Sequence, residues 1–191
     1  MKKYIIVFLM VILTTTNVKA ETVKVKLKKC VDGDTARFVI DNEVKSTRFL
    51  AINTPEIKHG KKQAEAYGVE ASKYTCKKLK NAKKIELEYD DNSDKTDKYG
   101  RVLAWVFVDE ELLQDDLVKN GYAEVKYLYG DYKYTSKLQK SEKKAKKEKL
   151  NMWSDDEYKN KEENEDVVDS FLDALLDDLF KFIRKKIKSM L

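Results

Sequence analysis

The sequence contains few of the residues on which zinc sites and disulfide-rich folds depend, with one histidine, two cysteines and one proline among 191 residues. His59 has no cysteine or histidine partner at metal-ligand spacing, and no CxxC motif is present, which argues against a zinc site. Cys30 falls on a predicted strand and Cys76 in a predicted helix. In an oxidising compartment the two can form a disulfide, and otherwise they are two buried thiols, so both alternatives stay open.

Long hydrophobic runs are also missing. The longest apolar run near the N-terminus, Tyr4–Leu13, has about half of the roughly 20 residues that a bilayer-spanning helix needs. Lys2 and Lys3 precede this run, and a small residue, Ala20, follows it. This pattern is typical of a secretory signal peptide over residues 1–20 that is cleaved after Ala20. We therefore expect a secreted, extracellular protein that is soluble or surface-associated.

Charged residues are abundant, at 38% of the chain with a formal net charge of +5. Removal of the predicted signal peptide takes away three lysines, and the last thirty or so residues are slightly acidic, so the central body is modestly basic. A basic body suits a protein that handles a polyanion such as nucleic acid. Lysine-rich solvated helices give the same balance, so the charge alone does not select a function.

Alternating and helical apolar patterns predict an α+β fold that is mainly β. The expected strands are Thr22–Val31, Ala36–Ile40, Val44–Ile52, Lys84–Tyr89 and Val102–Val108, with an extended piece at Tyr122–Tyr129. The expected helices are Glu65–Asn81, Leu112–Lys119 and Ser136–Leu150, followed by Met152 and Trp153 packed on the body. Five strands with a helix after the third favour a five-stranded oligonucleotide-binding (OB) barrel over residues 21–154, with an α+β sandwich as the alternative.

The C-terminal region differs from this domain. Residues 155–169 are nearly all polar or acidic and predict a flexible linker. Residues 170–191 predict an amphipathic helix with a wide apolar stripe and basic residues towards its end. This tail can dock on the body, self-associate or lie on an anionic membrane surface. Apart from such self-association we expect a monomer.

One stretch and its two flanking segments carry the candidate chemistry. Asp34, Asn53 and the Thr54 carbonyl offer oxygen ligands of the kind that a hard cation such as Ca²⁺ prefers. Glu56 follows closely and can activate a water molecule, while Arg48 and Arg101 suit a phosphate through paired hydrogen bonds. Each residue alone has an ordinary structural explanation, as a turn residue, a helix start or a surface ion pair. Together they indicate phosphodiester chemistry.

Three segments in the same order resemble the active-site segments of the staphylococcal nuclease (thermonuclease) family. They are Asp32–Thr35, Arg48–Glu56 and Thr96–Arg101, and the likeness runs from about Thr22 to Ser154. The resemblance implies an OB barrel with three helices. It also implies a Ca²⁺-dependent endonuclease that acts on DNA and RNA with little sequence specificity and leaves 3′-phosphates.

The resemblance also implies roles for individual residues. It implies metal ligation by Asp34 and the Thr54 carbonyl, and a general base at Glu56. Phosphate binding falls to Arg48 and Arg101. Further contacts to the nucleic acid are implied for Tyr99, Tyr127, Lys61 and Lys62.

One position departs from the family pattern. Asn53 stands where the best-known members have a second metal-binding aspartate. An amide oxygen still ligates but lacks the negative charge, so we expect weaker Ca²⁺ binding and retained activity. The alternative is a noncatalytic OB-fold module that binds nucleic acid without cutting it.

Overall fold

The computed structural model describes residues 22–57 and 64–155, together with isolated helical positions in the tail between residues 172 and 187. The predicted signal peptide, Lys61, Lys62 and the linker beyond residue 155 lie outside the described residues. In the part of the chain that the structure describes, every helix is too short or too polar to cross a lipid bilayer.

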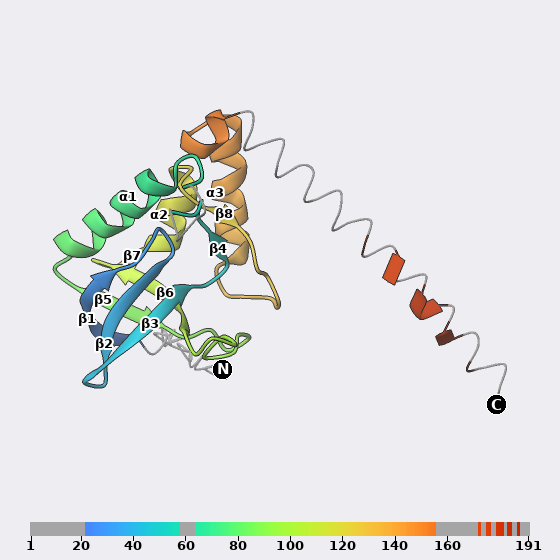
Figure 1. Ribbon diagram of the computed structural model, residues 1–191, viewed down its shortest axis with the longest axis horizontal. Helices are drawn as coiled ribbons and strands as arrows, with labels where there is room; N and C mark the ends of the chain where they lie inside the picture. Colours follow the sequence, from blue (N-terminus) through green and yellow to red (C-terminus); the bar gives the residue numbers. More distant parts are fainter. Residues whose placement is uncertain are drawn as a thin grey trace, which may run out of the picture.

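Five strands close into a barrel (Figure 1). They are β1 (Thr22–Cys30), β2 (Thr35–Ile40), β3 (Glu43–Phe49), β5 (Ile85–Glu88) and β6 (Val102–Val108). Antiparallel pairing runs in the order β3-β2-β1-β5-β6, and a parallel pairing of β3 with β6 closes the ring. A short strand, β7 (Glu111–Leu112), pairs antiparallel with the end of β6. Another, β4 (Ile52–Asn53), pairs with β8 (Glu124–Val125) outside the barrel. The predicted five-stranded barrel is confirmed.

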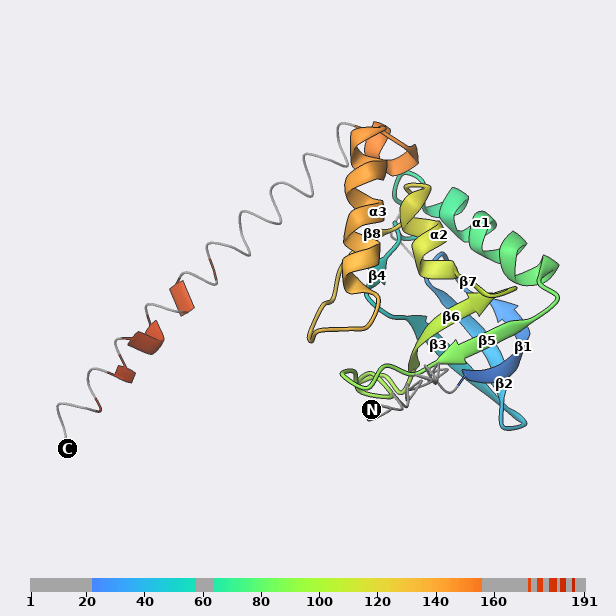
Figure 2. The ribbon, with the colours of Figure 1, turned by 180° about the vertical axis from the view of Figure 1, so that it is seen from behind.

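Three α-helices accompany the barrel: α1 (Gly68–Asn81), α2 (Leu113–Lys119) and α3 (Thr135–Lys147). Figure 2 shows α3 beside α2, and the two helices are in contact. A 3-10 turn, η1 (Asn151–Ser154), follows α3 and buries Met152 and Trp153 completely, as the sequence predicted. Gly121 ends the α2 region at a φ of 69°, which glycine adopts without steric cost.

The strand that the sequence predicts over Val44–Ile52 is divided in the structure. β3 ends at Phe49, and Ala51 has a φ of 61°, which is unfavourable for a residue with a side chain. The Ala51 carbonyl accepts a hydrogen bond of 3.1 Å from the Lys126 N–H. The chain thus leaves the barrel and pairs with β8 instead. This division places Asn53 opposite Glu124.

The first helix is also shorter than predicted. Tyr67 adopts a left-handed conformation, so α1 begins at Gly68 and not at Glu65. A side chain at Gly68 would collide with the Glu56 carbonyl oxygen. The absence of a side chain there allows the segment after β4 to pass directly against the start of α1.

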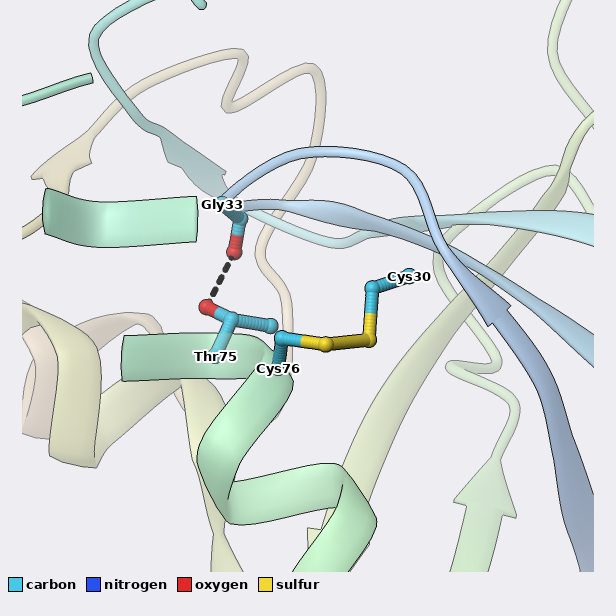
Figure 3. Close-up of a disulfide and its surroundings, with 4 residues drawn as sticks. All are labelled: Cys30, Gly33, Thr75 and Cys76. Atoms are coloured by element: carbon cyan, nitrogen blue, oxygen red, sulfur yellow. Dashed lines mark hydrogen bonds between the residues drawn. A yellow bond between two sulfur atoms is a disulfide. The ribbon is translucent and has the colours of Figure 1, made fainter. Parts of the chain in front are cut away.

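A disulfide joins Cys30 at the end of β1 to Cys76 in α1, with the two Cα atoms 5.6 Å apart (Figure 3). It settles the choice that the sequence left open between a disulfide and two thiols. Beside it, the fully buried Thr75 donates a hydrogen bond of 2.6 Å from its hydroxyl to the Gly33 carbonyl. The bridge and this hydrogen bond together attach the Asp32–Asp34 turn to α1.

The described tail positions are helical, and their apolar side chains are exposed to solvent. These exposed residues are Leu172, Leu175, Leu176, Leu179, Phe180, Ile183 and Ile187. Docking of the tail on the body is therefore not observed for these side chains. Self-association and membrane binding remain predictions.

Candidate active site

The barrel topology brings three separate segments to one rim. Thr35 at the start of β2 pairs with Arg48 near the end of β3, which sets Asp34 beside Phe49. In the parallel pairing, Arg48 lies opposite Leu103 of β6, two residues after Arg101. The register of the sheet therefore places the aspartate turn and both arginines at the same end of the barrel.

The Asp34 carboxylate is the centre of this rim, and it is buried. Its Oδ2 accepts hydrogen bonds from the Thr54 N–H at 2.9 Å and the Thr54 hydroxyl at 3.1 Å. Its Oδ1 accepts one from the Thr35 hydroxyl at 3.0 Å. Arg48 completes the set with an ion pair of 3.1 Å between its Nη1 and Asp34 Oδ2. These four donors hold the carboxylate in one orientation.

The Arg48 guanidinium joins the aspartate turn to the strand that carries Asn53. Its Nη1 donates to the Ile52 carbonyl at 2.8 Å, and its Nη2 donates to Asn53 Oδ1 at 3.3 Å. The guanidinium also lies 5.6 Å from the centre of the Tyr127 ring, within the range of a cation–π contact. Asp34 and Asn53 therefore direct one oxygen each at the same positive group.

This convergence of oxygens fits a hard cation. Oxygen atoms from a carboxylate, an amide and a backbone carbonyl are ligands of the type that Ca²⁺ takes. In the structure, Asp34 Oδ2 and Asn53 Oδ1 both contact a positive group, the Arg48 guanidinium. Among the described residues, no three His, Cys, Asp or Glu side chains gather into a metal-binding cluster. The described contacts bring together the Asp34 carboxylate and the Asn53 amide oxygen, and metal ligation by the Thr54 carbonyl stays a prediction.

Asp32 adds negative charge to this rim, although the sequence indicated only a turn residue. Burial raises the pKa of Asp32 to about 6, and the negative charge of Asp34 adds to the rise. A hydrogen bond from the Asp34 N–H and the positive charge of Arg48 act in the opposite direction and are smaller. Its Oδ1 accepts that hydrogen bond at 3.2 Å. In the sequence, the only indication that Asp32 belongs to the site is its position two residues before Asp34, across Gly33. A bound cation would relieve the repulsion between the two carboxylates.

Glu56 is exposed, and its backbone is held at both ends by Glu65. The Glu56 N–H donates to Glu65 Oε2 at 2.9 Å, and the Glu65 N–H donates to the Glu56 carbonyl at 2.9 Å. Sequence reasoning missed Glu65, because nothing in its local pattern distinguishes it from other surface glutamates. The clamp fixes the backbone of Glu56 and leaves its side chain exposed.

Arg101 is held by the loop in which it lies. Asp97 accepts hydrogen bonds from the Tyr99 N–H, the Arg101 N–H and the Arg101 Nε, the last at 2.6 Å. Burial acts to raise the pKa of Asp97, but these hydrogen bonds, led by the one from the Arg101 N–H, outweigh it and lower the pKa. The ionised Asp97 thus orients the guanidinium, a role that the sequence did not identify.

Exposed aromatic rings surround the two arginines. Tyr99 is 72% exposed and lies over the Arg101 guanidinium, while Tyr127 lies over Arg48. Tyr129, which was not among the predicted substrate-binding residues, is 85% exposed with its ring centre 6.4 Å from that of Tyr127. Exposed aromatic faces beside basic groups suit the stacking of nucleic-acid bases.

We expect Thr75→Val to lower the free energy of unfolding by about 1–3 kcal/mol, because the buried Gly33 carbonyl would lose its hydrogen-bond donor. Thr75→Ser keeps the hydroxyl and should stay much closer to wild type. Urea unfolding monitored by tryptophan fluorescence measures both variants. Equal stability of the valine and serine variants would show that this hydrogen bond does not attach the Asp32–Asp34 turn.

A closed barrel with a buried carboxylate, two arginines and exposed tyrosines at one rim is the arrangement that the described residues form. A family model described as "Staphylococcal nuclease homologue" matches residues 46–155, more than half of the chain. The chain belongs to the staphylococcal nuclease family. The resemblance inferred from the three sequence segments is confirmed.

Curated relatives agree with this assignment. The chain is similar to the SPbeta prophage-derived endonuclease YokF of Bacillus subtilis, at 43% identity over 139 residues, covering 72% of this chain and 46% of that protein. It is similar to endonuclease YncB of the same organism, at 39% identity over 137 residues, covering 71% and 64%. The thermonuclease of Staphylococcus hyicus is 36% identical over 129 residues, covering 68% and 75%. The matched region spans less than two thirds of the length of both Bacillus relatives.

Proposed function

We propose that the protein is an endonuclease that hydrolyses phosphodiester bonds of DNA and RNA in a Ca²⁺-dependent reaction. The observation that carries the proposal is the contact of Asp34 and Asn53 oxygens with the Arg48 guanidinium at the rim where Arg101 also lies. Such a rim offers acceptors for a cation and donors for a phosphate in one place. The names of the relatives, endonuclease and thermonuclease, support the same chemistry.

In this proposal each group has one task. Asp34, Asn53 and the Thr54 carbonyl would hold Ca²⁺, which when bound neutralises charge on the phosphoryl oxygens. Arg101 binds those oxygens through paired hydrogen bonds, and Arg48 does so once its contacts with Asp34 and Asn53 are exchanged for the phosphate. The Glu56 carboxylate accepts a proton from the attacking water molecule while the oxygen of that water forms a bond to phosphorus. The bond from phosphorus to the 5′ oxygen then breaks with its electron pair on that oxygen, which takes a proton from solvent water, so the products are a 3′-phosphate and a 5′-hydroxyl.

A noncatalytic binding module is the second candidate, and Asn53 is the residue that favours it, because it removes one negative charge from the cation site. Binding alone does not require a carboxylate beside two phosphate-binding arginines. The presence of Glu56 together with Arg48 and Arg101 favours the enzyme.

The proposal includes export. The leader-like pattern of residues 1–20 supports it, and so does the Cys30–Cys76 disulfide, because such bridges persist mainly in oxidising compartments. The exposed apolar face of the tail helix is available for self-association or for an anionic membrane surface. Comparing the partition of the protein between culture medium and cells with and without residues 165–191 tests the tail.

The activity is tested by incubating the purified protein with 5′-labelled single-stranded DNA and RNA in Ca²⁺ or in EDTA. We expect cleavage in Ca²⁺, none in EDTA, and products whose mobility changes after enzymatic removal of a 3′-phosphate. Tight binding to DNA without cleavage in millimolar Ca²⁺ would instead support the noncatalytic module.

A further inference from the structure

Glu124 is a buried carboxylate that the proposed mechanism does not use, and it contacts the candidate cation site. Its side chain is only 5% exposed. In the β4–β8 ladder Glu124 lies directly opposite Asn53, and Asn53 Nδ2 donates to Glu124 Oε1 at 2.8 Å. The Lys126 ammonium lies 3.4 Å from the same oxygen. A buried acid is thus placed one side chain behind a proposed metal ligand.

The hydrogen bonds with Glu124 and Arg48 select the same orientation of the Asn53 amide. An asparagine side chain has an oxygen that can ligate a cation and an NH₂ group that repels one, and the two differ by a rotation of the terminal amide. An ionised carboxylate only accepts hydrogen bonds, so Glu124 binds the NH₂ end. The opposite end, Oδ1, then faces the Arg48 guanidinium, which also contacts Asp34.

Glu124 also brings a carboxylate to the site. Asn53 is neutral where an aspartate would carry a negative charge, and Glu124 carries that charge at hydrogen-bonding distance from the amide. A carboxylate that accepts from the NH₂ group also polarises the amide and increases the negative character of its oxygen. The partly exposed Lys126 reduces this charge without removing the contact.

We propose that Glu124 is a positioning residue for the cation site. It holds the Asn53 amide with its oxygen towards Asp34, and it supplies from behind the negative charge that Asn53 lacks. This inference rests on the proposed Ca²⁺-dependent function and concerns how this chain completes the cation site without a second aspartate ligand.

The pairing changes what Asn53→Asp is expected to do. An aspartate at position 53 has no NH₂ group to donate, so its carboxylate would face the buried Glu124 carboxylate directly. Two like charges at that distance repel each other. The added charge of Asn53→Asp therefore benefits Ca²⁺ binding fully only when Glu124 is neutralised as well.

The test is calorimetric Ca²⁺ binding to the wild-type protein, Glu124→Gln, Asn53→Asp and the double variant. Glutamine keeps the shape and an acceptor oxygen but removes the charge. We expect Glu124→Gln to weaken Ca²⁺ binding about 10-fold, at the low end of the range for residues behind a metal ligand. In the Asn53→Asp background the same substitution should strengthen binding. Glu142→Gln is the matched control. Glu142 lies in α3 and accepts a hydrogen bond from the N–H of Val125, the neighbour of Glu124 in β8, without contacting Asn53 in any described hydrogen bond. This variant should bind Ca²⁺ as the wild type does.

A second measurement needs no variant and no metal. In the metal-free wild-type protein, one of the two Asn53 side-chain amide protons should resonate well downfield of the range of solvent-exposed asparagines, because it is bonded to a carboxylate. Absence of this downfield shift would overturn the proposal. Equal Ca²⁺ affinity of the wild type and a folded Glu124→Gln variant would overturn it as well. If the wild type itself neither binds Ca²⁺ nor cuts DNA, the proposed function fails. If it cuts and Glu124→Gln binds Ca²⁺ normally, only the role of Glu124 fails.

Discussion

Glu56→Gln is expected to lower kcat for DNA cleavage by about 10²–10⁴-fold, the usual contribution of a general base. Glutamine has nearly the same shape as glutamate but cannot accept the proton of the attacking water. The backbone at this position is held by Glu65, so the substitution should leave the fold unchanged. The measurement is the single-turnover rate on a 5′-labelled strand at saturating Ca²⁺, with Ca²⁺ affinity and thermal stability recorded in parallel.

The matched control is Glu70→Gln, because Glu70 is an exposed glutamate in the first turn of α1. It should cleave at the wild-type rate. A Glu56→Gln variant that retains most of its single-turnover rate while the control is also unaffected would mean that another group accepts the proton. A loss of Ca²⁺ binding in Glu56→Gln would instead make Glu56 a metal ligand.

Loss of the Cys30–Cys76 bridge is expected to lower the free energy of unfolding by about 4 kcal/mol, from the loop-closure entropy of a sequence separation of 46 residues. For a domain of this size that corresponds to a fall in Tm of roughly 10–15 °C. The comparison is between the wild type and the Cys30→Ser/Cys76→Ser double variant in urea and in thermal unfolding.

The bridge should also affect the cation site, because it lies beside the Thr75–Gly33 hydrogen bond that attaches the Asp32–Asp34 turn to α1 (Figure 3). We expect the double variant to require a higher Ca²⁺ concentration for half-maximal cleavage. Reductant should destabilise the wild type and leave the double variant unchanged. Identical stability of the wild type with and without a reductant that breaks the bridge would contradict the prediction.

The sequence by itself determined the elements whose signals are local. The dense apolar run over Val102–Val108 forms β6 with those same ends, and Gly121 ends the α2 region in the left-handed conformation that glycine adopts readily. Such features depend on side-chain periodicity and on the backbone freedom of single residues, which nearby residues decide. The three motif segments likewise identified the family, because their residue types and order are visible in one dimension.

Tertiary structure alone decided how those segments meet. The third predicted strand divides after Phe49 because Leu50 makes the last hydrogen bond to β6 and Ile52 then pairs with Val125 of β8. The Asn53–Glu124 contact spans 71 residues, and the disulfide spans 46. The orientation of an amide and the pairing of two thiols depend on groups that only the closed barrel brings together. Local propensity carries no information about such distant partners. From the sequence, Asn53 only removes a negative charge from the predicted cation site, whereas in the fold its amide is hydrogen-bonded to the buried Glu124.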